Sequence, residues 1–427
     1  MSSSTFRGIT AMLVLCGSVL PASAQPLPVP DTLLARLTRE ALTTNFAIAA
    51  LTNRARAADA RAVTAGALPN PMLTVGVIDL ALPRFAFRQS DFTEVDVQAE
   101  QAFPWPGTLA ARTQSAQAAA RATTAGLEAQ KRDVIVRVAR VYFRLRSVVT
   151  AESLLARQRT VLDAAVQTST SRYSTGAVPQ SDPLQARVAA ARLDADATDL
   201  RAEEATLRAQ LRSLRGRSRA DTVAVAVIRP EEADSLIAAG DAQHAGNPPH
   251  LDRNPQVTAQ LAAEQSATSL ARAERLAARP EFTLTTRYGA RPLGVDFFTA
   301  MVGVRLPLWR GRTPARMAEA AEAEAAAARD AVADTRANLR AEWDATIASA
   351  SANRERLDIL VHRVLPPADA AVDAALRAYS LGGADISAVL TAQEARYRAQ
   401  VAIAQNVADH LTHLVLLVQL AAPEVGS

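Results

Sequence analysis

Long stretches with a helical spacing of small apolar residues make up most of the chain, and short stretches of alternating apolar and polar residues separate them. From residue 107 to 173, and again from 312 to 379, the pattern stays helical. At about 1.5 Å per residue, each of these helices would run roughly 100 Å. Pro366 and Pro367 predict a kink or a brief interruption of the second helix, because proline removes a hydrogen bond from a helix interior.

The second half of the sequence repeats the first. The segment RYSTGAVPQSDPL (172–184) corresponds to AYSLGGADISAVL (378–390), 206 positions later. Two further pairs match at similar offsets, namely AFPWPGTLAAR (102–112) with RLPLWRGRTPAR (305–316), and ALPNPMLTV (67–75) with AARPEFTLT (277–285). A shared offset along the whole chain indicates two tandem structural repeats with few insertions between the matched blocks.

We therefore expect a first repeat over 25–216, a connector over 217–253 and a second repeat over 254–427. Each repeat would begin with a helix, at about 31–66 and 254–278, continue through two strands, and end in a long helical hairpin. The returning helix of the first hairpin carries leucines seven residues apart, which is typical of a coiled-coil seam: Leu193, Leu200, Leu207 and Leu214.

The tips of the two hairpins are predicted at 172–182 and 378–387. Gly176 and Gly382 end a helix there, because glycine adopts a positive φ without steric cost. Asp182 precedes a proline, which resembles a helix N-cap followed by proline at the first helical position.

Four strands are predicted, at about 72–82, 92–103, 281–289 and 297–307. Apolar side chains that share one face are Val95, Val97, Phe282, Leu284, Tyr288, Phe298, Val302 and Val304. Strands of about 10 residues are long enough to cross a bilayer when tilted. A soluble protein with two hairpins packed on helices is the alternative. Because the hairpin recurs and nothing else in the sequence offers a covering layer, we expect these residues to face membrane lipid.

Four strands cannot close a barrel, since even a barrel filled with side chains needs about eight. Open strand edges are not tolerated in lipid. A barrel must therefore be shared between copies, with eight strands in a dimer or twelve in a trimer, and the strand pattern does not choose between them.

The N-terminus resembles a secretory signal peptide over residues 1–24. Arg7 precedes an apolar run that ends in the small-x-small motif Ala22-Ser23-Ala24. Cys16, the only cysteine, lies inside this run, and the preceding Leu15 is larger than a lipoprotein signal prefers. No other segment reaches the length expected of a transmembrane helix, so a membrane role would require the strands.

Composition excludes several classes of function. Net charge is only +4 and arginine is spread evenly among acidic residues, so no basic patch indicates nucleic acid. No nucleophile motif, carboxylate pair, glycine-rich phosphate loop or metal cluster is apparent, so we expect neither an enzyme nor a cofactor. His410 and His413 could share a metal, but without a third ligand a packed pair is favoured.

With these motifs the sequence resembles the outer-membrane efflux protein (TolC-like) family over about residues 31–420. The resemblance rests on LPNPML, on the FPWPG and PLWRGR junctions, on the paired YSxG turns and on VLTAQ (389–393). It implies a mainly α fold with a β-barrel portion, in which a homotrimer shares a twelve-stranded outer-membrane barrel. Long antiparallel coiled-coil hairpins would continue this barrel as a periplasmic tunnel.

The resemblance also implies a function without catalysis. Such a trimer is a passive exit duct that receives substrates from an inner-membrane transporter, here expected to be of the resistance-nodulation-division type, through a periplasmic adaptor (membrane fusion) protein. The alternative function is a periplasmic coiled-coil structural or adaptor protein that has the same helices and no barrel.

By the same resemblance, the tips form the tunnel entrance and the adaptor-docking site. The residues concerned are Tyr173, Gly176, Asp182, Tyr379, Gly382 and Asp385. In the family, a second-tip tyrosine and a nearby arginine bind an aspartate of a first tip. Tyr379 and Asp182 match two of these groups, but Ala384 occupies the arginine position. We therefore expect weaker contacts to hold this entrance.

Trp105 and Trp309 follow strands at equivalent points of the two repeats. Because indole prefers the headgroup level of a bilayer, they are candidate membrane-interface anchors, with packing at the strand-to-helix junction as the alternative.

Overall fold

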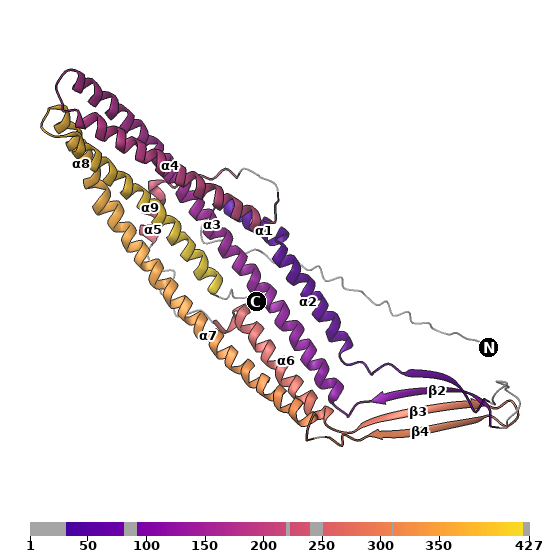
Figure 1. The fold of residues 1–427 in the computed structure, drawn as a ribbon. Coiled ribbons are helices and arrows are strands. Elements are labelled where there is room, and N and C mark those ends of the chain that lie inside the picture. The colour runs from indigo at the N-terminus through magenta and orange to yellow at the C-terminus, as the bar shows by residue number, and fades with distance from the viewer. Residues whose placement is uncertain (1–30, 81–91, 219–222, 240–250, 310, 422–427) are drawn as a thin grey trace, which may run out of the picture.

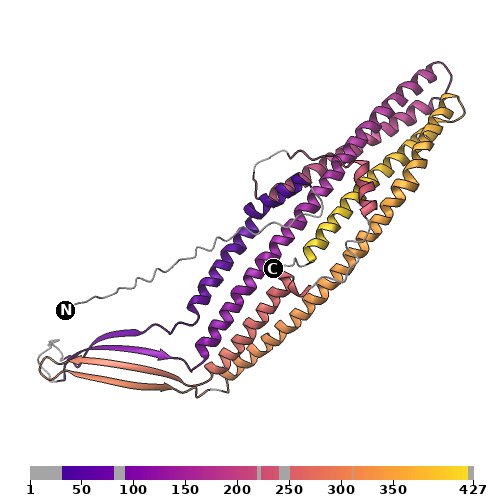
Figure 2. The same cartoon turned by 180° about the vertical axis from the view of Figure 1, so that it is seen from behind.

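The protein is an elongated helical bundle with a four-stranded sheet at one end and two hairpin tips at the other (Figures 1 and 2). The computed structural model describes residues 31–80, 92–218, 223–239, 251–309 and 311–421. The predicted signal peptide with Cys16, the last two residues of the first predicted strand and part of the predicted connector lie outside these residues.

The helices of the first repeat are α1 (Thr32–Thr44), α2 (Phe46–Thr64), α3 (Thr108–Ser174) and α4 (Ser181–Leu214). After α5 (Pro230–Ala239) and a short 3₁₀ turn (Leu251–Arg253), the second repeat contains α6 (Pro255–Ala277), α7 (Pro314–Asp358), α8 (Leu365–Ser380) and α9 (Ile386–Leu420). The helix α3 is unbroken over 67 residues. Its counterpart is divided by a π-helical segment at Ile359–Val364, directly before Pro366 and Pro367, where the prolines predict an interruption.

Two joints place helices end to end, and the sequence pattern does not reveal them. The predicted first helix is broken at Asn45, whose ψ of 125° is extended. The Asn45 side-chain amide caps α2 and donates from Nδ2 to the carbonyl of Leu214, the last residue of α4, at 2.8 Å. Asn254 caps α6 and donates to the carbonyl of Leu420, the last residue of α9, at 3.3 Å. In this way α4 continues into α2, and α9 continues into α6.

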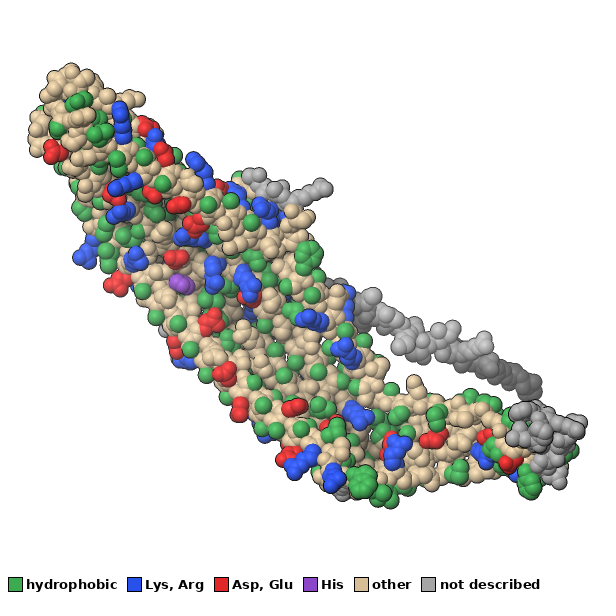
Figure 3. All heavy atoms as spheres, in the orientation of Figure 1, with side chains coloured by type: hydrophobic (Ala, Val, Ile, Leu, Met, Phe, Trp, Pro, Cys, Tyr) green, Lys and Arg blue, Asp and Glu red, His purple; other side chains and the backbone are tan. Residues whose placement is uncertain are grey.

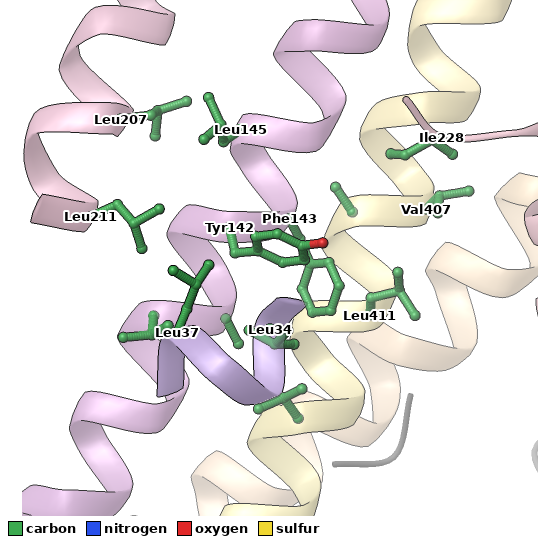
Figure 4. Close-up of a cluster of buried hydrophobic side chains, with 14 of the residues drawn as sticks. Leu34, Leu37, Tyr142, Phe143, Leu145, Leu207, Leu211, Ile228, Val407 and Leu411 are labelled. Carbon is green, nitrogen blue, oxygen red and sulfur yellow. The ribbon is translucent and has the colours of Figure 1, made fainter. Parts of the chain in front are cut away.

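The main core lies midway along the bundle, where α1, α3, α4 and α9 meet (Figure 4). Tyr142 and Phe143 of α3 are buried at its centre with their ring centroids 5.4 Å apart. The hydroxyl of Tyr142 donates to Asp31 at 2.6 Å, and the same carboxylate caps α1. Leucines of α1 and α4 close this core from one side, and Val407 and Leu411 of α9 close it from the other.

One described helix, α9, is long and apolar enough to span a membrane. The prediction that no segment after the signal peptide reaches this length is therefore wrong. Half of its most apolar window is buried inside the fold. Val407, Leu411 and Val415 are buried in the main core, so α9 packs against the other helices of the bundle.

The sheet is antiparallel in the order β1 (Met72–Ile78), β2 (Glu94–Phe103), β3 (Glu281–Ala290) and β4 (Phe297–Arg305). Its central pair joins the two repeats, with Val97 opposite Tyr288 and Phe103 opposite Phe282. The sheet extends beyond the end of the helical bundle in both ribbon views (Figures 1 and 2).

Candidate functional site: the hairpin tips and the exposed sheet

The two tips are built alike. At the first, the amide of Gly176 donates to the carbonyl of Tyr173, and the amide of Ala177 donates to that of Arg172. At the second, Gly382 donates to Tyr379 and Gly383 to Ala378 in the same pattern. This is the Schellman motif, and its glycines have φ values of 73° and 77°. Both glycines thus end their helix as the sequence predicts.

A small hydrophobic cluster joins the two hairpins behind the tips. Its buried members are Ala186, Tyr379, Ile386 and Val389, and α3 and α8 add partly buried residues. Two of these residues were predicted at the tips or next to them, but the contact between hairpins is known only from the structure. The cluster contacts α3 at Ala165 and Val166, about two turns before its end, and α8 at Ala375 and Tyr379, close to the second tip (Figure 1).

Arg172, in the last turn of α3, makes the polar connection between the hairpins. Its Nη1 donates to the carbonyl of Tyr379 at 2.6 Å, and its guanidinium carbon lies 4.8 Å from the centre of the tyrosine ring. The carbonyl of Tyr379 also accepts from Gly382, so both of its lone pairs are used. Sequence reasoning missed Arg172. The one signal in the sequence is that a cation precedes Tyr173 at the first tip, whereas Ala378 precedes Tyr379 at the second.

Asp182 and Tyr379 are close together but are not hydrogen-bonded to each other. Burial raises the pKa of Tyr379, Asp182 raises it further, and Arg172 opposes the change. The Tyr379 hydroxyl is buried and has no hydrogen-bond partner among the described residues. The expected N-cap role of Asp182 is wrong, because α4 begins at Ser181 and Asp182 lies inside the first turn. Its side chain is only 3% exposed.

The other predicted tip residues lie at the surface. Tyr173 is 44% exposed, whereas its counterpart Tyr379 is 6% exposed. Asp385 is exposed and takes the N-cap position of α9, although its side chain makes no capping hydrogen bond. Leu381, which follows Ser380 and precedes Gly382, is 87% exposed. The second tip thus presents a large apolar side chain at the extreme end of the bundle.

At the opposite end, one face of the sheet is apolar and uncovered. The strand pairing places all the predicted lipid-facing residues on this face: Val95, Val97, Phe282, Leu284, Tyr288, Phe298, Val302 and Val304. Phe298 and Val302 are 70% and 76% exposed. A soluble chain rarely leaves a continuous apolar face of this kind open to water.

The other face of the sheet is polar. Glu94 and Asp96 are buried there, and Arg287 forms ion pairs with both. Arg291 pairs with Glu94 at 3.3 Å. The two faces therefore differ as the lipid-facing and lumen-facing sides of a membrane barrel differ. Within the described sheet, β1 and β4 each have one neighbour, which leaves one edge of each strand open.

The two tryptophans differ in their surroundings. Trp309 lies between β4 and α7 and is exposed. Trp105 lies between β2 and α3, where it stacks on Phe282 with ring centroids 6.0 Å apart and has Arg279 over its ring. The exposure of Trp309 is compatible with the predicted interfacial role, whereas Trp105 packs at the strand-to-helix junction, which is the alternative role.

Among the described residues, no group of three or more His, Cys, Asp or Glu side chains is arranged to hold a metal ion. His410 is buried and hydrogen-bonds the carbonyl of Ala350 through Nδ1 at 3.1 Å. His413 contacts Asn353, and burial lowers the pKa of His413. On the face seen in Figure 3, acidic and basic side chains are interspersed along the bundle.

Comparison with known proteins identifies the fold over nearly the whole chain. The structure superposes on VceC from Vibrio cholerae with a TM-score of 0.74, 17% identity and coverage of 91% of this chain and 96% of that chain. For the Campylobacter jejuni CmeC outer membrane channel the TM-score is 0.75 at 13% identity, with 92% and 86% covered. The outer-membrane channel OprN gives 0.75 at 18% identity, with 92% and 90% covered.

A comparison of the sequence with curated proteins finds no match. The family model described as outer membrane efflux protein matches residues 37–217, which span the first repeat from α1 to the end of α4. The second repeat has the same order of elements and the same tip geometry. The chain is thus similar to the outer membrane efflux protein family over its first repeat, and it shares the fold of the outer-membrane channels over both repeats.

Proposed function

We propose that three copies of this protein form the outer-membrane exit duct of a tripartite efflux system. The observation that carries the proposal is the amphipathic sheet at one end of a long helical bundle, with its apolar face uncovered and two strand edges open. Such a sheet is complete only when other copies pair with its edges and lipid covers its outer face.

In the trimer, β4 of each copy pairs with β1 of the next, which closes a barrel of twelve strands and leaves no edge. The ion-paired face with Glu94, Asp96 and Arg287 then lines the lumen. Trp309, and to a lesser extent Trp105, anchor the barrel at the membrane interface facing the periplasm.

The helices carry the conduit from the barrel into the periplasm. At about 1.5 Å per residue, the 67 residues of α3 extend roughly 100 Å. The four helical rods of each copy are α3, α7 with α8, and the two pairs that Asn45 and Asn254 join. Three copies placed around an axis make a tunnel wall that continues the barrel.

The tips form the entrance and receive the periplasmic adaptor protein. Gly176 and Gly382 shape the turns, and Tyr379 and Asp182 lie at the contact between hairpins. The exposed Leu381, with Asp385 beside it, offers an apolar and acidic end surface for an adaptor. The driving energy comes from an inner-membrane transporter, which we place in the resistance-nodulation-division class, and the duct itself is passive.

The alternative, a periplasmic coiled-coil protein without a barrel, leaves the apolar face of the sheet in water. Cell fractionation and electrophoresis of unheated samples distinguish the two. We expect the protein in the outer-membrane fraction, with heat-modifiable migration and with channels in planar bilayers. Recovery as a soluble periplasmic protein that forms no channel would contradict the proposal.

A further inference from the structure

A partly enclosed pocket lies where the connector between the repeats packs on the helical bundle. Its walls come from α3, from α9, from the π-helical segment Ile359–Val364, and from the end of the connector with the start of α5. The volume of the pocket is about 260 Å³. Because π-helical segments are rare and occur frequently at functional sites, a pocket that one of them lines is a candidate binding site.

The floor of the pocket is apolar. Four buried apolar side chains line it, namely Ile228, Ala233, Ile403 and Ala404. Thr150 is also buried there, but its hydroxyl already donates to a backbone carbonyl of α3 and accepts from the amide of Ile228 at 2.8 Å. Water therefore finds few hydrogen-bond partners on this floor, and an apolar ligand group that displaces it gains affinity.

The rim of the pocket is polar and positively charged. Arg157 of α3 and Arg229 of the connector line the pocket, and both are exposed. Ser153 and Gln400 line it as well and are partly exposed. Within the described part of the chain, none of these four side chains forms a hydrogen bond or an ion pair. Their polar groups are therefore available to a ligand.

Acidic neighbours do not neutralise this rim. None of the described residues that line the pocket is acidic. The carboxylate of Glu232, in the first turn of α5, accepts the backbone amide of Arg229 and forms an ion pair with Arg146 at 2.8 Å. Its charge is thus already matched by a guanidinium outside the pocket. The charge and the two surfaces of the pocket together favour an anion with an apolar body.

We propose that this pocket binds a medium-chain fatty acid, with the alkyl chain on the apolar floor and the carboxylate at the rim that Arg157 and Arg229 form. A guanidinium matches a carboxylate through two parallel N–H···O bonds. The volume is below the range of about 300–1,000 Å³ that is typical of pockets for drug-sized ligands, so the pocket suits one alkyl chain and not the two chains of a phospholipid. The site lies within a single chain, so the inference goes beyond the proposed function and does not require a channel.

Isothermal titration calorimetry of the purified protein in lipid nanodiscs tests this proposal. Octanoate is the probe, and empty nanodiscs measure its partition into lipid. We expect saturable binding of one octanoate per chain. Acetate has the charge without the alkyl chain, and octylammonium has the alkyl chain with the opposite charge, so neither should bind.

Substitutions separate the contributions of the rim and the floor. Arg157→Gln and Arg229→Gln should each weaken octanoate binding about tenfold, the change expected for the loss of one charge-assisted hydrogen bond. Both arginines are exposed, so these variants should fold. Leu154→Trp places a larger ring at the wall of the pocket and should also weaken binding. Arg187→Gln removes an exposed arginine of α4 outside the pocket and should bind octanoate as the wild type does.

Heats of octanoate binding equal to those of empty nanodiscs would overturn the inference, and so would equal affinities for octanoate and octylammonium. Arg157→Gln and Arg229→Gln variants that bind octanoate as tightly as Arg187→Gln would overturn it as well. A protein that binds octanoate as expected and forms no channel in planar bilayers would contradict the proposed function alone.

Discussion

Asn45 and Asn254 occupy equivalent places in the two repeats, and each closes two helix ends at once. The Oδ1 atom accepts backbone amides of the helix that begins there, and Nδ2 donates to the last carbonyl of the helix that ends there. Helix ends leave unpaired amides and carbonyls, and here one amide side chain serves both kinds of group. Both asparagines are buried.

Replacing Asn45 with aspartate should separate these two roles. Aspartate still caps α2, but the carbonyl of Leu214 loses its donor and faces a carboxylate instead. We expect a loss of about 1–3 kcal/mol in the free energy of unfolding, measured by denaturant titration. Asn254→Asp should act similarly on α9. The exposed Asn53→Ala is the control and should stay within about 0.5 kcal/mol of the wild type.

Gly382→Ala should weaken the second tip through its backbone alone. The residue has a φ of 77°, and a Cβ atom there would meet nothing within 4 Å. Alanine in the left-handed conformation should destabilise the turn by about 1–2 kcal/mol. This destabilisation should appear as faster proteolytic cleavage at the tip. The adjacent Gly383→Ala, where φ is not positive, should leave the cleavage rate unchanged. Equal rates for both variants would argue against the turn geometry.

Neighbouring positions of β3 offer a matched test of the membrane face. Leu284 lies on the exposed apolar face, and Thr285 lies on the polar face opposite Glu100. Leu284→Arg should make the free energy of insertion into lipid vesicles less favourable by roughly 2–4 kcal/mol. The fraction of protein in the heat-modifiable band measures this insertion. Thr285→Arg should insert nearly as well as the wild type. Equal insertion of the two variants would contradict the assignment of faces.

Alkaline unfolding should report on Tyr142. Burial raises the pKa of Tyr142 above its ordinary value of about 10, and the hydrogen bond to Asp31 raises it further. The unfolded chain therefore ionises first, so this contribution to stability is present below pH 10 and is lost as the pH rises above it. Tyr142→Phe should lower stability at pH 8, and the difference from the wild type should shrink by pH 11. A constant difference across this range would refute the assignment.

The sequence predicts those parts of the fold that depend on local pattern. The two hairpins, the glycine turns and the faces of the strands follow from periodicity and from the repeat. The joint at Asn45 could not be predicted, because its partner Leu214 lies 169 positions away and an asparagine within a helical pattern carries no such signal. Arg172 was missed for the same reason, since its partner Tyr379 is 207 positions away.

The Asp182 N-cap shows a different limit of sequence reasoning. Its position before a proline satisfies the local rule, yet α4 begins at Ser181, two residues before the start that an Asp182 N-cap would set, and Asp182 is buried in the fold. The local capping rule therefore does not set this helix boundary.

The unbroken length of α3 has a mechanical consequence. A rod of roughly 100 Å that pivots near the sheet by about 3° moves its far end by roughly 5 Å. A displacement of that size at the tips needs no helix to melt and no strand to leave the barrel. Because α3 is unbroken, a small change of tilt near the sheet would be amplified along its length into a displacement of that size at the hairpin tips.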